Sequence, residues 1–131
     1  MFLPSSHNTA RLWALKSYEK RKNRVKQLLQ QTRSNIHLSF DLWSSGNHYA
    51  FNAIVAHFVR PDYTITSVLL AFRNLLSPHL GENITGSVNE VIQDYEIQSR
   101  LGCFILDNAT SNDTAVETLR KIYKWLKNAH R

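Results

Sequence analysis

The spacing of apolar residues changes at Ile36, and this change limits the fold more than any other feature of the chain. From Thr9 to about Thr32, apolar residues recur at steps of three and four, which predicts an amphipathic helix. Over Ile36–Leu42, apolar side chains alternate with polar ones, among them Asp41, which predicts a strand with one apolar face. A chain with both periods is expected to build an α/β fold, in which helices cover a sheet.

The rest of the chain adds three strands and two helices to this pattern. Strands are predicted at about 49–59 and 64–72, separated by a turn that contains Pro61. A loop at 77–81 precedes a helix at about 82–96; a strand follows at 103–106 and a helix at about 112–128. The unbroken apolar run at 103–106 predicts a strand buried on both faces. The resulting order, a basic helix and then β-β-β-α-β-α, predicts a meander whose first strand lies beside and parallel to the fourth, at the centre of a mixed sheet.

Composition indicates one folded domain in a reducing compartment. The chain has 131 residues, of which 43% are hydrophobic and 20% charged, and this is enough for one core. Its single cysteine, Cys103, has no partner for an internal disulfide and no histidine at zinc-ligand spacing, so a buried, inert thiol is expected. Neither a signal peptide nor an apolar run of membrane-spanning length is present, so we expect an intracellular protein without a membrane partner.

The positive charge is concentrated at the N-terminus. Residues 1–35 carry eight basic side chains and one acidic one, whereas the remaining residues carry eight basic and nine acidic. Such a segment is typical of contact with a nucleic-acid backbone, although a solvated helix face has the same composition. The candidate DNA contacts are Lys20, Arg21, Lys22, Arg24 and Lys26.

Two aspartates are expected to meet at one edge of the sheet. Asp41 lies near the end of the first strand, and Asp107 follows the fourth. Parallel neighbouring strands end at the same edge, where α/β proteins bind ligands. A divalent cation would relieve the repulsion between the two carboxylates, and such metals promote phosphoryl transfer. An aspartate at a strand end also serves as a helix cap or a turn former, so the spacing alone leaves this open.

Four segments, taken together, resemble a known family. They are 36–45, 56–59, 79–84 and 106–113, with the sequences IHLSFDLWSS, AHFV, HLGENI and LDNATSND. In order and spacing they resemble the catalytic-core motifs of hAT-superfamily DNA transposases, and the likeness extends over about 20–119.

The resemblance implies an incomplete ribonuclease-H-like domain at 34–131, preceded by a basic helix at 1–33. It also implies a nuclear protein that binds Mg²⁺ or Mn²⁺ through Asp41 and Asp107, the family's first two catalytic acids. The third, a glutamate, is expected beyond a further strand and an inserted helical domain, so none of these residues takes that role. We therefore expect a transposase fragment that is inactive alone; a segment of an active enzyme and a domesticated nucleic-acid- or protein-binding module are the alternatives.

Several nearby residues have two interpretations. Glu82 is either a supplementary metal ligand or a carboxylate that complements its helix dipole. His79 is either a loop ligand or a structural histidine. Trp43 either stacks on an unpaired base or packs at the sheet edge. Asn108 and Asn112 either orient Asp107 or serve as loop and cap residues. The unpaired edge of the fourth strand also predicts self-association.

Overall fold

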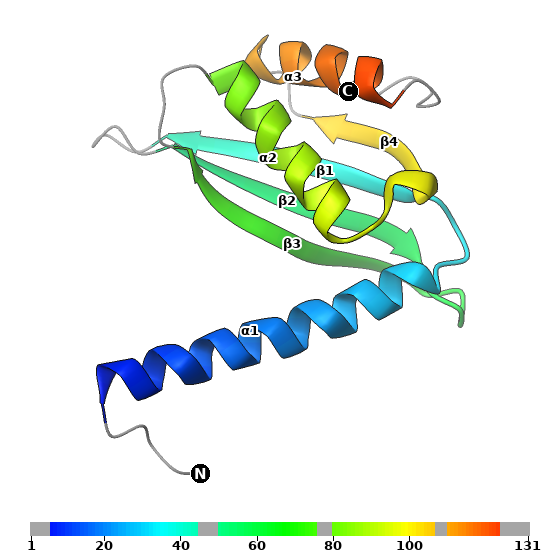
Figure 1. The fold of residues 1–131 in the computed structure, drawn as a ribbon. Helices are drawn as coiled ribbons and strands as arrows, with labels where there is room; N and C mark the ends of the chain where they lie inside the picture. The colour runs from blue at the N-terminus through cyan, green and yellow to red at the C-terminus, as the bar shows by residue number, and fades with distance from the viewer. Residues whose placement is uncertain (1–5, 45–49, 76–79, 107–109, 124–131) are drawn as a thin grey trace.

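A four-stranded mixed sheet, two helices on one face of it and a long N-terminal helix make up the fold (Figure 1). The computed structural model describes residues 6–44, 50–75, 80–106 and 110–123. Its elements are α1 (His7–Gln30), β1 (Ile36–Ser44), β2 (Ala50–Val59), β3 (Ile65–Leu75), α2 (Leu80–Asp94), a short 3-10 helix (Gln98–Arg100), β4 (Leu101–Leu106) and α3 (Thr110–Ile122). This order confirms the predicted helix followed by β-β-β-α-β-α.

The sheet has the predicted connections. Its strand order is β3-β2-β1-β4, with β1 antiparallel to β2, β2 antiparallel to β3, and β1 parallel to β4. The crossover through α2 makes the β1–β4 pair parallel, as expected for a β-α-β unit. Among the described residues β1 is an inner strand and β4 forms one edge, so the outer side of β4 is unpaired there, as predicted.

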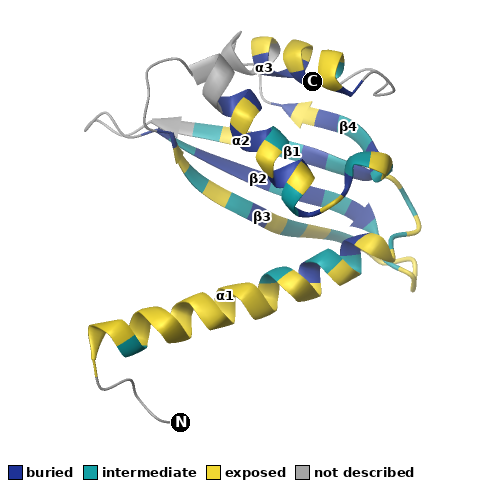
Figure 2. Cartoon of the chain, viewed as in Figure 1, coloured by how far each residue is buried: buried dark blue, intermediate teal, exposed yellow. Residues whose placement is uncertain are grey.

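The core lies between the sheet and the helices α2 and α3. Leu38 and Phe40 of β1 and Phe104 of β4 are almost fully buried on the helix side, where Phe40 and Phe104 meet edge to face. Val88 of α2 and Leu119 of α3 are fully buried against them. The other face of the sheet carries no described helix, and its described residues, apart from the buried Ala53, are mostly half-buried or exposed (Figure 2).

Helix α1 is anchored only at its C-terminal end. Val25 and Leu29 are its buried residues, and Gln30 Nε2 donates to the carbonyls of Tyr95 and Glu96. The N-terminal part projects away from the sheet (Figure 1). Only part of the apolar stripe of α1 is therefore packed, because Leu12, Leu15 and Tyr18 are 57%, 49% and 51% exposed. Of the described helices, none combines the length and apolarity needed to cross a membrane.

Several predicted boundaries shift by a few residues. Helix α1 begins at His7, two residues before the predicted start at Thr9, and Ser6 is its N-cap: Ser6 Oγ accepts from the Thr9 N–H at 3.2 Å. Leu80 and Gly81 begin α2 instead of ending a loop. Strand β4 has only one buried face, since Ile105 is 40% exposed. The predicted end of the last helix at Asn128 lies outside the described residues.

Candidate functional site

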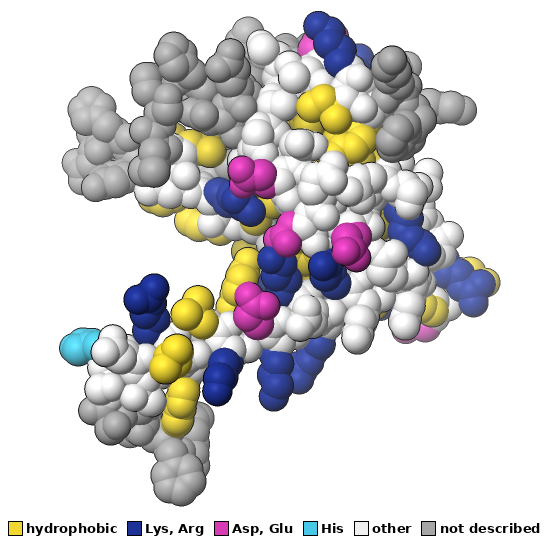
Figure 3. All heavy atoms as spheres, in the orientation of Figure 1, with side chains coloured by type: hydrophobic (Ala, Val, Ile, Leu, Met, Phe, Trp, Pro, Cys, Tyr) yellow, Lys and Arg dark blue, Asp and Glu magenta, His cyan; other side chains and the backbone are white. Residues whose placement is uncertain are grey.

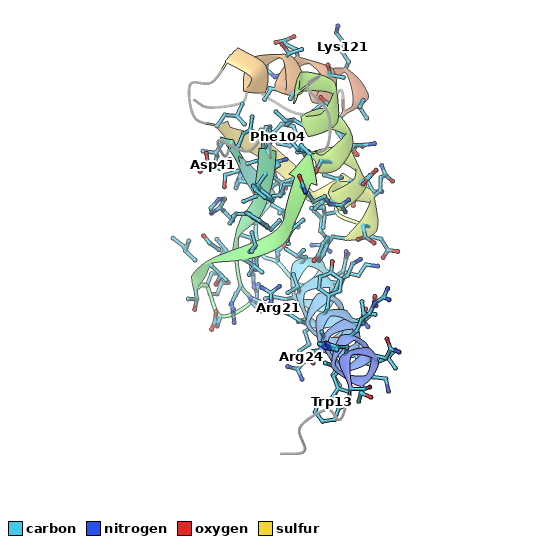
Figure 4. All side chains as sticks on the ribbon, turned by 90° about the vertical axis from the view of Figure 1, so that its left-hand side faces the viewer. Trp13, Arg21, Arg24, Asp41, Phe104 and Lys121 are labelled. Atoms are coloured by element: carbon cyan, nitrogen blue, oxygen red, sulfur yellow. The ribbon has the colours of Figure 1, made fainter. Side chains whose placement is uncertain are left out.

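Asp41 occupies the end of the sheet where the site was predicted. It lies on β1 opposite Ala53 of β2, and it is exposed. Because side chains alternate along a strand, Asp41 points to the face opposite Phe40, away from α2 (Figure 4). The last residues paired between β1 and β4 are Phe40 and Leu106. In the sequence, Asp41 directly follows Phe40 and Asp107 directly follows Leu106. Asp107 itself lies outside the described residues.

A hollow of about 340 Å³ opens beside Asp41 on this face of the sheet. Ser39, Asp41, Ala53, Val55 and Ile105 are among the residues that line it. The helices α2 and α3 both begin at the end of the sheet where β1 and β4 finish (Figure 1). Helix N-termini carry partial positive charge, so both helices favour negative groups at this end.

The other predicted residues near this edge are described only in part or not at all. His79 and Asn108 lie outside the described residues. Trp43, Glu82 and Asn112 lie on β1, in the first turn of α2 and in α3 respectively, but their side chains are not described. Among the side chains that are described, no group of three or more His, Cys, Asp and Glu could hold a metal ion.

A row of hydrogen-bonded polar residues crosses the open face of the sheet, and the sequence analysis did not predict it. His57 of β2 lies between two hydroxyls: Ser39 Oγ is 2.7 Å from Nε2, and Ser67 Oγ is 2.8 Å from Nδ1. Burial and, to a smaller extent, the neighbouring His37 lower the pKa of His57, so its ring is neutral at pH 7. Ser39 lies two positions before Asp41 on the same face of β1, so this row stands beside the hollow. The alternation over Ile36–Leu42 predicts that Ser39 lies on this face. The sequence does not predict that His57 lies beside it, because that depends on the register between β1 and β2.

Cys103 belongs to the adjoining part of the same face. Its backbone N–H donates to His37 Nδ1 at 3.0 Å, and its Sγ lies 3.0 Å from the same nitrogen. Burial raises the pKa of the thiol, which keeps it protonated and unreactive at neutral pH. The neighbouring Gly102 leaves room for the His37 ring, since a Cβ there would overlap it. The predicted buried thiol is half-buried in the structure.

The five basic residues predicted to contact DNA fall into two groups. Lys22 pairs with Asp94 and lies within 6 Å of the Tyr18 and Tyr95 ring centres, at 5.9 and 5.8 Å. The pKa of Lys22 is raised, chiefly by its hydrogen bond to Asp94. Lys26 lies 3.9 Å from a Glu96 carboxylate oxygen. Lys20, Arg21 and Arg24 are exposed. Figure 3 shows Lys and Arg side chains on α1 and at its junction with the sheet layer.

Comparisons with known proteins show which family the chain is similar to. Residues 39–129 match the ZBED1 RNase-like domain family. A transcriptional regulator of Talaromyces stipitatus, tpeD, is 30% identical over 98 residues, which make up 73% of this chain and 12% of that protein. A Zea mays protein that carries the name AC transposase is 22% identical over 114 residues, 87% of this chain and 14% of its own length. The chain thus spans a small part of these relatives. The structure of the Mos1 transposase catalytic domain, solved with raltegravir and Mg, aligns with 86% of this chain and 60% of its own chain, with 17% identity and a TM-score of 0.33.

Proposed function

The chain belongs to the ZBED1 RNase-like domain family, and on that premise we propose that it supplies one side of a metal-dependent phosphoryl-transfer site acting on DNA. The family match and the similarity to AC transposases confirm the predicted relation to hAT transposases and the ribonuclease-H-like fold. We propose in addition that the chain binds a divalent metal ion, that it acts on DNA and that Asp41 and Asp107 are the acidic ligands.

The β1–β4 register is the observation that carries the proposal. Phe40 and Leu106 are paired in parallel strands, and adjacent strands lie about 4.8 Å apart. If that pairing continues by one residue, Asp41 and Asp107 stand side by side on the face that bears the hollow. Two carboxylates at this spacing are within reach of one divalent cation.

The residues at this edge fit Mg²⁺ or Mn²⁺. Asp41 is exposed, no described ion pair involves it, and it lies in an open hollow with carboxylate oxygens of the kind that these hard cations prefer. Asp41 and Asp107 would hold the ion, with Glu82 as a supplementary ligand. When bound, the ion would activate the nucleophile and stabilise the charge that develops on a phosphate. Ser39 and the neutral His57 would hold polar groups of the substrate beside it.

We propose that the isolated chain does not cleave DNA. Phosphoryl transfer requires the full ligand set to position the attacking oxygen, and the third acid is expected outside these residues. The alternative is a domesticated module that binds nucleic acid or protein without catalysis, through the basic residues of α1.

Paramagnetic broadening by Mn²⁺ tests the metal site directly. In amide NMR spectra, low Mn²⁺ concentrations should broaden the signals of Ser39, Asp41 and Ile105 first. Asp41→Asn and Asp107→Asn should each abolish this selectivity, because either change removes one of two ligands. Asp62→Asn, on the exposed β2–β3 turn, is the matched control and should change nothing. Broadening that persists in both variants, or that centres elsewhere, would rule out the site in favour of the binding module.

We also propose a partner, a subcellular location and a self-association surface for the chain. DNA is the proposed partner, because residues 1–35 hold the whole positive excess of the chain. A protein that acts on chromosomal DNA works in the nucleus. Self-association is proposed through the open face of the sheet, where Leu69, Phe72 and Ile105 are 42%, 57% and 40% exposed.

A further inference from the structure

The basic residues of α1 that form ion pairs lie on a different side of the helix from a second set of basic residues, which form none among the described residues. Lys22 and Lys26 reach carboxylates at the end of α2, and they lie in the part of the helix that contacts the sheet layer. Arg21 precedes the buried Val25 by one turn, so it lies on the same side. Lys22 and Lys26 are therefore half-buried and neutralised beside the body of the domain, whereas Arg21 is exposed but faces that side.

The opposite side of α1 carries a second set of cations. Lys16 precedes Val25 by nine residues, and Lys20 precedes Leu29 by nine, which is about two and a half helical turns. Each lysine therefore lies directly opposite a buried residue. Arg24 continues the row at the same four-residue step, and all three side chains are exposed. Among the described carboxylates, none forms an ion pair with this row.

Trp13 extends the same row toward the N-terminus. It lies three residues before Lys16, it is 42% exposed, and it points away from the sheet (Figure 4). A hollow beside this stretch of α1 is lined by Leu12, Trp13, Lys16 and Lys20, among other residues. A flat aromatic ring at the end of a cationic row can stack on an unpaired base while the cations contact phosphates.

We propose that Trp13, Lys16, Lys20 and Arg24 form a binding site for the sugar-phosphate backbone of DNA, and that Lys22 and Lys26 fasten α1 to the domain. Charge complementarity selects this ligand: the three cations from Lys16 to Arg24 span about 12 Å of helix, and a duplex of that length carries roughly seven phosphates. The inference rests on the proposed action on DNA, but it uses no metal and no residue of the sheet edge.

Two double variants that remove the same charge separate the row from the fastening pair. Binding of the full chain to a fluorescent 20-base-pair duplex is measured by anisotropy, in EDTA, between 50 and 300 mM salt. In Lys16→Gln/Lys20→Gln the slope of log K against log salt should decrease by about 1.8, or 0.9 for each lost phosphate contact. In Lys22→Gln/Lys26→Gln the slope should stay the same while the melting temperature falls. Equal loss of slope in both variants would show a response to net charge alone and would overturn the proposal.

Two further arms decide the ligand and the role of Trp13. In separate measurements at 150 mM salt, the duplex is replaced by phosphatidylserine vesicles or by a poly-glutamate peptide. Tighter binding of the chain to either probe than to DNA would overturn the choice of ligand. Trp13→Ala should weaken binding to a duplex with a single-stranded overhang more than to a blunt duplex, and equal weakening would refute stacking. Asp62→Asn, on the exposed β2–β3 turn and outside both proposed sites, should leave all these values unchanged, and EDTA removes any contribution of a bound metal. A failure of the metal site would therefore appear in the Mn²⁺ experiment alone.

Discussion

Replacing Asn52 with leucine should stabilise the domain. Asn52 lies on the helix side of β2 between Leu42 and Arg73, and it is 0% exposed. Neither its Nδ2 nor its Oδ1 has a hydrogen-bond partner among the described residues. Burying an amide without a partner costs about 1–3 kcal/mol in protein variants. Leucine has a similar volume and no polar atom, so Asn52→Leu should raise the free energy of unfolding by about 1–3 kcal/mol.

Urea denaturation followed by circular dichroism measures this change. With a slope near 2 kcal/mol per molar urea, the midpoint should rise by about 0.5–1.5 M. Asn74→Leu is the matched control, because Asn74 is exposed on β3 and should change the free energy of unfolding by less than about 0.5 kcal/mol. A lower midpoint for Asn52→Leu, with the control unchanged, would refute the reasoning. It would mean that the buried amide is hydrogen-bonded, for example to an enclosed water.

Two further predictions concern His57 and Leu29. Burial and His37 lower the pKa of His57 in the folded state, so as pH falls the unfolded chain takes up a proton at this ring before the folded chain does. The neutral His57 therefore contributes to the stability of the fold. That contribution is complete above pH 6.5, the ordinary pKa of histidine, and is lost as pH falls through the lower pKa of the folded state. His57→Gln should therefore reduce the loss of urea midpoint between pH 7.5 and pH 5, and an unchanged loss would contradict the assignment. Leu29→Ala should lower the free energy of unfolding by about 2–5 kcal/mol, because Leu29 is 0% exposed where α1 is anchored. Leu12→Ala, at a position 57% exposed, should change it by less than about 0.5 kcal/mol, and similar effects at both positions would show that α1 is not anchored as described.

Local patterns and connection rules were enough to predict the sheet. Alternation over Ile36–Leu42 predicted which side chains of β1 face the helices, and the handedness of crossovers predicted the parallel β1–β4 pair. Both features depend on short stretches of sequence or on general chain geometry. The β-bulge between Ile54 and Val55 shows the limit, because it depends on how β2 and β3 pair across their whole length.

Contacts between distant residues could not be predicted in the same way. The row that joins Ser67, His57 and Ser39 requires the register of three strands, which no single segment determines. The apolar pattern of α1 likewise predicted an amphipathic helix, but the described residues cover its apolar side only near Val25 and Leu29. Periodicity reports which side of a helix is apolar and carries no information on how much of it finds a partner.

The anchoring of α1 limits how far the proposed DNA site can lie from the proposed metal site. The segment between α1 and β1 is held by the end of β2: the Arg33 N–H donates to the Val59 carbonyl at 2.9 Å, and the Val59 N–H donates to Ser34 Oγ at 2.9 Å. Because this junction is held by hydrogen bonds, α1 and the sheet should move as one body. Along the chain, Lys20 and Asp41 are separated by helix, connection and strand that together span at most about 50 Å. That distance corresponds to about 15 base pairs of duplex, so one short DNA segment held on α1 could extend to the carboxylate edge of the sheet.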